Sequence, residues 1–172
     1  MLFRSPGILH KTEAGAVRLH LSTPHEVRDA AIQMRDQLAA QGHGPTGFLL
    51  QRMAKPGVEM IVGVVHDPQF GPVVLVGDGG IHMELLKDFA LLMPPFDAAE
   101  VHRKLERLRV APLLAGLDIA RFADMAVRLG EAALAWREAV ASIDVNPVML
   151  FETGSGAVAL DALVERAAII PA

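Results

Sequence analysis

The chain has 172 residues, 52% of them hydrophobic, which is enough to build a real core in one domain or in two small lobes. Its 16 lysine and arginine residues against 20 acidic residues give a net charge of −4, so a nucleic-acid partner is not expected. Cysteine is absent, so disulfides and thiolate ligands are excluded. There is no apolar run of the roughly 18 residues that a membrane span requires, and the N-terminus lacks a signal-peptide pattern. We therefore expect a cytoplasmic protein without membrane contact.

Three helices are predicted along the chain. Thr23 and Glu26 form a capping-box pattern ahead of an apolar face, and Gly42 is expected to end that first helix. The other two helices are expected to begin after Asp97 and after Asp118.

Strands are predicted between and after these helices, bounded by turn residues. The residues 47–53 form one candidate strand, and 58–65 and 73–77 form a hairpin around "HDPQFGP". The residues 142–151 and 157–164 form a final hairpin around "ETGSG". Hairpins with helices between them predict an α+β fold with a largely antiparallel sheet and flanking helices.

The final hairpin carries the most informative spacing. Its turn centres near Gly154, so Asn146 and Asp161 lie about equally far from the turn and should face each other, with their Cβ atoms roughly 5 Å apart. An amide oxygen and a carboxylate on neighbouring strands suit Mg²⁺, and Asp144 should lie on the same face as Asn146. The alternative interpretation is that Asn146 and Pro147 end a strand at a bulge and that Asp161 is a solvated edge residue.

Three ordered stretches carry a resemblance to a known family. They are "SPGILHKTEAGAV" (5–17), "PGVEMIVGVVHDPQFGPVVLVGDGGIHMELLKD" (56–88) and "IDVNPVML" (143–150). Together they resemble the ATP-grasp domain of the ADP-forming acyl-CoA synthetases, relatives of the succinyl-CoA synthetase β subunit, from about Arg4 to Leu163. The resemblance implies an ATP-grasp-like fold, binding of ATP or ADP with Mg²⁺, and an enzyme that interconverts acyl-CoA, ADP and phosphate with free acid, CoA and ATP.

The resemblance also implies a phosphoryl carrier near the N-terminus. It makes His10 the histidine that accepts the phosphoryl group, and it makes Lys11 a cation that helps to hold the negative charge. A neutral imidazole is nucleophilic near pH 7, which suits this role. The alternative is that His10 is an ordinary histidine of a surface loop.

Five further positions match nucleotide and metal contacts of the family. Gln51 matches the hinge around adenine, Met53 would pack against the ring, and Glu59 matches the carboxylate that holds the ribose hydroxyls. Asn146 and Asp161 match the metal ligands. Gln51 and Glu59 could instead be exposed strand residues.

Asp144 and the glycine-rich residues 77–88 each have a functional and a purely structural interpretation. Asp144 occupies the place of an acid that, in the succinyl-CoA synthetase relatives, steadies a phosphohistidine presented by the partner subunit, or it is a solvent-facing strand carboxylate. The glycine-rich residues 77–88 could approach phosphates, with Glu84, Lys87 and Asp88 lining the same cleft, or they form a simple turn.

The sequence departs from the family pattern in ways that bear on activity. The family's domain normally starts about one small lobe earlier, with a strand carrying a lysine for the nucleotide phosphates. The loop rich in arginine, glycine and proline that is expected after "LLAG" is missing. We therefore expect a fragment, a degenerate relative or a sequence with omitted residues. In it, 1–46 would be the remainder of a truncated N-terminal ATP-grasp lobe and 47–172 the C-terminal lobe.

Two function classes follow. In the first, the chain is the nucleotide-binding part of an ADP-forming acyl-CoA synthetase, inactive alone, whose partners are CoA-binding and ligase domains or a subunit that hold most of the CoA site. In the second, it is a noncatalytic ATP-grasp-like module for assembly or regulation, as in acetyltransferase fusions. A homo-oligomer is compatible with either, because an incomplete domain exposes apolar surface.

Overall fold

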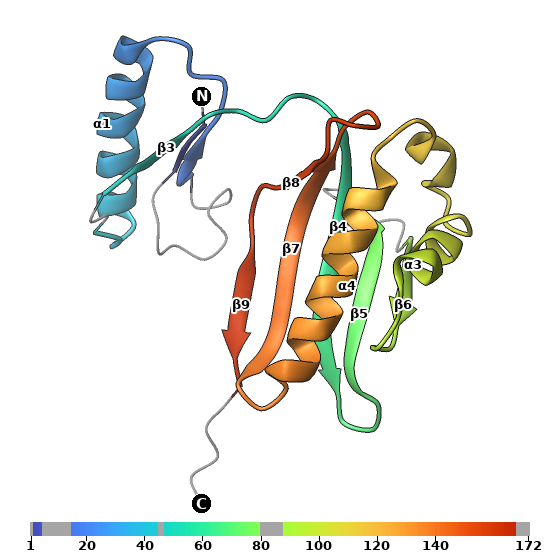
Figure 1. Cartoon of the computed structure of the whole chain (residues 1–172). Helices are drawn as coiled ribbons and strands as arrows, with labels where there is room; N and C mark the ends of the chain where they lie inside the picture. The colour runs from blue at the N-terminus through green and yellow to red at the C-terminus, as the bar shows by residue number, and fades with distance from the viewer. Residues whose placement is uncertain (1, 5–14, 45–46, 80–87, 168–172) are drawn as a thin grey trace, which may run out of the picture. The chain divides into compact units, whose positions relative to one another are not determined.

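A computed structural model describes residues 2–4, 15–44, 47–79 and 88–167 of the chain (Figure 1). These residues belong to two compact units, Met1–Lys55 and Pro56–Ala172. The strand at Leu49–Gln51 pairs with the N-terminal strand and so belongs to the first unit. The division into ATP-grasp lobes at 46/47 stays a prediction.

The first unit contains a three-stranded antiparallel sheet and one helix. The strands are β1 (Leu2–Arg4), β2 (Val17–Arg18) and β3 (Leu49–Gln51), in the order β2-β1-β3. The helix α1 spans Pro24–Ala40. The sheet is built from residues near both ends of the unit, so β1 lies between two strands that are distant in sequence.

The predicted capping box starts α1. The backbone N–H of Glu26 donates to the Thr23 hydroxyl at 3.2 Å, and the Glu26 carboxylate accepts from the Thr23 backbone N–H at 3.3 Å. Farther along the helix, Met34 and Leu38 are fully buried in a small cluster with Ala16. The cap and this apolar face together explain why the segment forms a helix.

The second unit is built on a six-stranded antiparallel sheet. The order is β6-β5-β4-β7-β8, and β9 also pairs with β7. The strands are β4 (Val58–Asp67), β5 (Gly71–Asp78), β6 (Phe89–Leu92), β7 (Val140–Leu150), β8 (Ala157–Ala159) and β9 (Leu163–Arg166). Both predicted hairpins, β4–β5 and β7 with β8 and β9, are confirmed, and so is the largely antiparallel sheet.

Helices α3 (Ala98–Leu105) and α4 (Ile119–Ala135) pack against this sheet, with the short 3₁₀ helix η1 (Ala111–Leu114) between them. The Asp97 carboxylate accepts from the Glu100 backbone N–H at 2.8 Å, which confirms the predicted start of α3. In Figure 1, α4 runs across β4, β5 and β7. The helices within the described residues are all too short or too polar to span a membrane.

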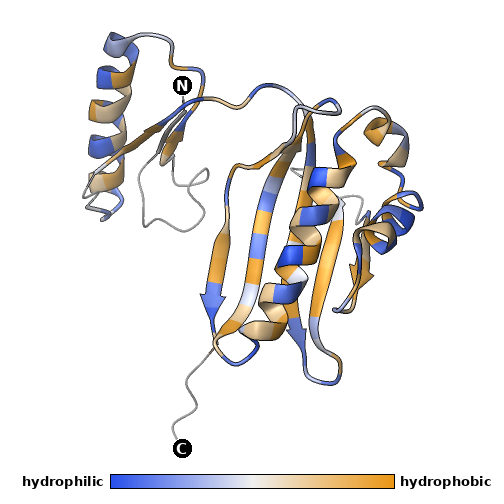
Figure 2. Cartoon of the chain, viewed as in Figure 1, coloured by the Kyte–Doolittle hydropathy of each residue, from blue (hydrophilic) through white to orange (hydrophobic). Residues whose placement is uncertain are grey.

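The sheet of the second unit has two faces of different chemistry. The helix-covered face packs against α4 and is lined by fully buried Met60, Val62, Val64, Val74 and Val76. Figure 2 shows β5 as hydrophobic over most of its length, whereas β7 alternates between hydrophobic and hydrophilic residues. Because side chains alternate along a strand, the residues between the buried ones point to the other face. We call that other face, which carries Glu59, Gly63 and Asp144, the carboxylate face.

Candidate functional site

The register of β7 against β8 and β9 places Asn146 across from Asp161. The flanking pairs are Val148 with Ala159 and Asp144 with Leu163. Both ladders keep the same register, so the position opposite Asn146 between them is Asp161, and the Leu160 backbone N–H donates to the Pro147 carbonyl at 2.9 Å. The geometric part of the prediction is therefore present in the fold, whereas the role of the two residues as metal ligands stays a prediction.

Asn146 and Pro147 form a bulge in the middle of β7. The pairing of β4 with β7 shifts by one residue between Met60 and Val62, so Asn146 and Pro147 both lie opposite Ile61. The strand continues beyond them to its end at residue 150, so the bulge does not terminate it. A bulge of this kind re-aims a side chain without ending the ladder, which is compatible with a ligand at Asn146.

Asp144 and Asp161 are electrostatically coupled. Partial burial of the Asp144 carboxyl raises its pKa above the ordinary value of 3.8, and the negative charge of Asp161 raises it further. The residue as a whole is still exposed, so the effect on its charge state is modest. A nearby cation would relieve the repulsion between the two carboxylates, because an opposite charge favours their ionised forms.

The donor set fits Mg²⁺. Asn146 and Asp161 supply an amide oxygen and a carboxylate, and Mg²⁺ usually takes one or two carboxylates and completes its shell with water and phosphate oxygens. Across the described ranges, no cluster of three or more His, Cys, Asp or Glu residues could hold a metal ion. The site therefore suits a cation that shares its coordination with a ligand, and it does not suit a closed structural metal centre.

Glu59 lies on the same face as Asp144, farther along the sheet. It is exposed on β4 opposite Met149, and its backbone carbonyl accepts from the Gly79 N–H at 2.9 Å. Two residue positions of β4 separate it from the bulge, which is roughly 7 Å along the strand. Gly63 lies opposite Asp144 and adds no side chain there, so this part of the face stays free of bulk.

The remaining predicted residues belong to other parts of the chain. Gln51 is the exposed last residue of β3, and Met53 is half-buried in the segment that follows it; both belong to the first unit. Four predicted residues lie outside the described part of the chain: His10, Lys11, Glu84 and Lys87.

Asp88 has a structural role, which corrects its assignment to a nucleotide cleft. Its side chain is buried, with 9% exposure, and its carboxylate accepts from the backbone N–H groups of Arg109 at 3.1 Å and Val110 at 2.9 Å. These bonds tie the segment before β6 to the turn before η1. A carboxylate that is buried and satisfied in this way is not available to a ligand.

Asp118 has a partner that the sequence pattern did not indicate. It precedes α4 as expected, but its side chain makes no capping bond to that helix. Its carboxylate accepts instead from the backbone N–H groups of Gly154 at 3.1 Å and Gly156 at 2.9 Å, in the turn between β7 and β8. An acid just before a helix normally indicates a cap, so the only sequence signal for this contact is the pair of glycines in the turn.

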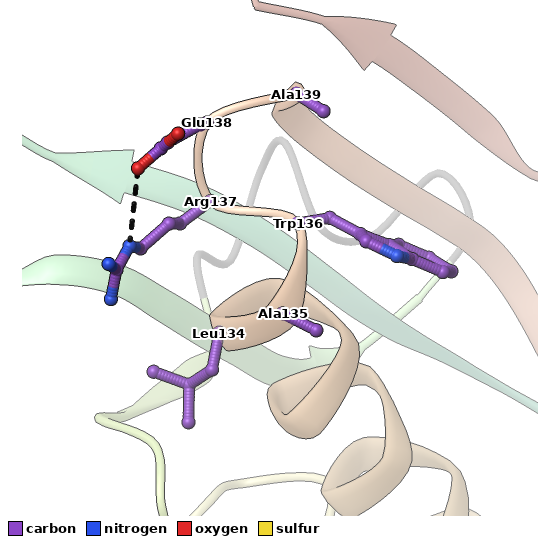
Figure 3. Close-up of a pocket in the computed structure, with 6 residues that line it drawn as sticks. All are labelled: Leu134, Ala135, Trp136, Arg137, Glu138 and Ala139. Atoms are coloured by element: carbon purple, nitrogen blue, oxygen red, sulfur yellow. Dashed lines mark ion pairs between the residues drawn. The ribbon is translucent and has the colours of Figure 1, made fainter.

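Two hollows beside α4 contain none of the predicted site residues. One, of about 390 Å³, is lined by the consecutive residues Leu134–Ala139, where Trp136 and Arg137 point away from each other (Figure 3). In it, the Arg137 guanidinium lies 4.0 Å from the Glu138 carboxylate. The other, of about 570 Å³, lies between α4 and the start of β8. The predicted residues Glu59, Asp144, Asn146 and Asp161 therefore lie outside both hollows.

Comparison with known proteins points to one family. The ATP-grasp domain family matches residues 1–165. The chain is 44% identical over 167 residues to a trans-feruloyl-CoA synthase from an unknown prokaryotic organism, covering 91% of this chain and 24% of that protein. It is 35% identical over 168 residues to the β subunit of acetate–CoA ligase [ADP-forming] I from Pyrococcus furiosus, covering 92% of this chain and 70% of that subunit.

Solved structures agree in fold. The dinucleotide-forming acetyl-coenzyme A synthetase 1 of Ca. Korarchaeum cryptofilum, in complex with coenzyme A, Ca-AMPCP and HgCl⁺, superposes with a TM-score of 0.87 at 30% identity, over 96% of this chain and 76% of that chain. A second structure of that synthetase, with coenzyme A and Mg-AMPPCP, has its phosphohistidine segment pointing towards the nucleotide binding site. Its TM-score is 0.82 at 28% identity, over 97% of this chain and 76% of that chain. The chain thus spans about a quarter of the feruloyl-CoA synthase and about 70% of the P. furiosus subunit.

Proposed function

The chain belongs to the ATP-grasp family, among the ATP-grasp domains of ADP-forming acyl-CoA synthetases, and from this membership we propose that it is the nucleotide-binding part of such an enzyme. The whole enzyme would interconvert acyl-CoA, ADP and phosphate with free acid, CoA and ATP. The predicted ATP-grasp-like fold is confirmed by the family match and by the superposed structures.

The observation that carries the proposal is the composition of the carboxylate face. Glu59 on β4, Asp144 and Asn146 on β7, and Asp161 between β8 and β9 are directed to one face by β-sheet alternation and register. These polar side chains lie outside the main hydrophobic cluster, which the same strands build on the helix-covered face. Carboxylates and an amide gathered on one sheet face outside the main core are typical of a ligand site.

Within this proposal, a nucleotide lies along the carboxylate face with its ribose and phosphates at separate contacts. Asn146 and Asp161 would hold Mg²⁺, and the ion would supply charge neutralisation at the phosphates. Glu59, roughly 7 Å farther along β4, accepts from the ribose hydroxyls. Gln51 and Met53 keep their proposed roles at adenine.

We assign the phosphoryl transfer to His10. In the direction of ATP synthesis, an ADP β-phosphate oxygen attacks the phosphorus carried by the imidazole, the P–N bond breaks as the P–O bond forms, and His10 leaves with its electron pair on nitrogen. Lys11 compensates negative charge beside it, and Asp144 steadies the imidazole of a phosphohistidine. The phosphohistidine segment of the Korarchaeum synthetase, directed at its nucleotide site, supports this assignment by analogy.

The chemistry at the acyl group is assigned to partner domains or subunits. The chain spans only 24% of the feruloyl-CoA synthase, so that relative carries much more protein than this chain matches. CoA-binding and ligase domains would form acyl phosphate or acyl-CoA and exchange the phosphoryl group with His10. The single chain would then contribute nucleotide affinity, and turnover would require its partners.

Calorimetric titration with ADP tests the metal site directly. ADP should bind more tightly with excess MgCl₂ than with EDTA, and Asp161→Asn should abolish most of that increase, roughly tenfold or more, while the variant stays folded. Asp124→Asn is the matched control, because it removes one exposed carboxylate on α4 and should leave the Mg²⁺ effect intact. Equal Mg²⁺ effects in wild type and Asp161→Asn would remove Asp161 from the site.

The same titration separates the catalytic proposal from the alternative of a noncatalytic module. A module that keeps the fold only for assembly has no need of a metal-dependent nucleotide site. No measurable ADP binding with Mg²⁺, either alone or together with the CoA-binding partner, would therefore favour that alternative.

A further inference from the structure

Asp118 is one of two buried charged residues in the described part of the chain, and its contacts point away from its own helix. Its side chain is 9% exposed, and one carboxylate oxygen accepts from both Gly154 N–H and Gly156 N–H. Both glycines have positive φ angles, +85° and +83°, which orient the turn so that its N–H groups can converge on one oxygen. Within the described residues, no cationic side chain pairs with Asp118, so these turn N–H groups meet its charge.

Further backbone hydrogen bonds join the start of α4 to the β7–β8 turn. The Asp118 N–H donates to the Phe151 carbonyl at 2.9 Å, and the Thr153 N–H donates to the Gly116 carbonyl at 2.9 Å. The Thr153 hydroxyl donates to the Gly116 carbonyl at 3.0 Å or to the Leu117 carbonyl at 3.2 Å. The turn is therefore held from outside the hairpin, by residues that belong to the entry of a helix.

That helix is fixed in the core of the second unit. Phe122, Ala123 and Ala126 on the first turns of α4 have no exposed surface, and α4 packs on β4, β5 and β7. A turn that is hydrogen-bonded to the start of α4 is therefore attached to a closely packed part of the unit. The Asp118 carboxylate joins the turn of the hairpin to this fixed end of the helix.

The strands that follow the β7–β8 turn are short. β8 has three residues and β9 has four, and Asp161 lies in the gap between them, five residues after Gly156. A slip of one residue would turn Asp161 to the opposite face and away from Asn146. The position of the turn relative to β7 sets this register.

We propose that Asp118 is a positioning residue for nucleotide-linked metal binding: by holding the β7–β8 turn, its buried carboxylate keeps Asp161 opposite Asn146. The inference rests on the proposed metal role of Asn146 and Asp161. Asp118 itself does not reach the carboxylate face, because its contacts are in the turn and at the entry to α4.

Asp88 supplies a matched control. It is also 9% exposed and its carboxylate also accepts from two backbone N–H groups, those of Arg109 and Val110. Those groups lie near η1 and not in the β7–β8 hairpin, so loss of Asp88 should destabilise the unit to a similar extent without moving Asp161.

The experiment compares Asp118→Ala and Asp118→Asn with Asp88→Ala and Asp88→Asn in the full chain. The measured quantity is the ratio of the ADP dissociation constants in EDTA and in excess MgCl₂. Asp118→Ala should lower this ratio about tenfold or more, because a residue that orients a metal ligand typically contributes 10–100-fold to affinity. Asp118→Asn should lower it less, since its amide oxygen can still accept from the glycine N–H groups.

Hydrogen exchange reports the hairpin itself. The Leu160 N–H, which is bonded to the Pro147 carbonyl next to Asp161, should exchange faster in Asp118→Ala than in Asp88→Ala. If Asp118→Ala does not fold, the same two measurements on Asp118→Asn decide the matter.

The outcomes separate this inference from the proposed function. A wild-type ratio near one would overturn the metal site and the positioning role together. A ratio that is high in wild type, lost in Asp161→Asn and unchanged in the folded Asp118 variants would refute the positioning role alone. An equal loss in the Asp88 variants would also refute it, because the effect would then be general destabilisation.

Discussion

The two faces of the second unit's sheet are built from alternate residues of the same strands, yet they do opposite things. On β4, Met60, Val62 and Val64 have no exposed surface, whereas Glu59, which directly precedes Met60, is exposed. On β7, buried Ile143 flanks exposed Asp144 in the same way. One face lowers the free energy of the folded state by burying apolar surface, and the other leaves its acids accessible to a ligand.

The difference teaches that stability and binding can be changed independently in this unit. A substitution on the helix-covered face changes packing and should reach the ligand site only through unfolding. A substitution on the carboxylate face removes a charge that contributes little to the core and should change binding with little effect on stability. Each of the following substitutions tests one side of this comparison.

The largest expected effect on stability comes from the helix-covered face. Phe122 on α4 is fully buried, so Phe122→Ala should lower the free energy of unfolding by about 3–5 kcal/mol. For a chain of this size that corresponds to a fall in Tm of roughly 10 °C. Urea denaturation followed by circular dichroism measures the change, with Leu134→Ala, an exposed leucine of the same helix, as the control.

The affinity of Phe122→Ala for ADP tests whether the two faces are independent. Well below the Tm of Phe122→Ala, its affinity for ADP with MgCl₂ should match that of the wild type. A large loss of affinity in the folded variant would show that the two faces are coupled and would break the comparison.

A smaller effect is expected for Glu59 on the carboxylate face. Glu59→Gln keeps the shape of the side chain and removes the charge that would accept from the ribose hydroxyls. ADP affinity should therefore fall roughly tenfold, while Tm stays constant because the side chain is exposed. Calorimetry with ADP and with 2′,3′-dideoxy-ADP distinguishes the ribose contact from a general charge effect.

The wild type should prefer ADP over the dideoxy nucleotide, and the variant should lose that preference. Glu131→Gln on α4 removes a comparable exposed charge and should keep it. A preference that survives in Glu59→Gln would exclude Glu59 from the ribose contact.

The smallest expected effect concerns Asp144 and depends on pH. Partial burial and the charge of Asp161 raise the pKa of Asp144 in the folded chain above 3.8, so the folded state binds this proton more tightly than the unfolded state. Above the raised pKa the ionised carboxylate therefore destabilises the metal-free chain, and Asp144→Asn should raise Tm by about 1 °C at pH 7. The gain should shrink as pH falls through the raised pKa and vanish below 3.8.

Adding Mg²⁺ and ADP should change which of the two proteins, wild type or Asp144→Asn, has the higher Tm. With excess MgCl₂ and ADP the order should reverse, because the bound cation favours two ionised carboxylates and the variant has lost one of them. A thermal melting series across roughly pH 3–7, with and without the metal and nucleotide, gives both comparisons. A wild type that is more stable than Asp144→Asn in EDTA at pH 7 would show that Asp161 does not repel Asp144.

Much of the fold could be predicted from local sequence because its signals are local. The structure contains the predicted capping box of Thr23 and Glu26 and the predicted turn between β4 and β5. Both signals act over only a few residues. The pairing of Asn146 with Asp161 was also predictable, since the turn near Gly154 sets the register of everything that follows it. The family resemblance depended on ordered motifs of the same kind.

Only the tertiary structure decided which partner each buried acid takes. Sequence by itself determined that Asp118 stands before a helix, where a carboxylate usually caps, but the approach of the β7–β8 turn offers it two glycine N–H groups instead. In the same way, Asp88 follows a glycine-rich stretch that suggests a phosphate site, and the fold brings it the N–H groups of Arg109 and Val110. A buried carboxylate must be satisfied by whatever donors the fold brings within reach, and those donors lie 21 to 38 positions away in the chain, beyond the range of any local pattern.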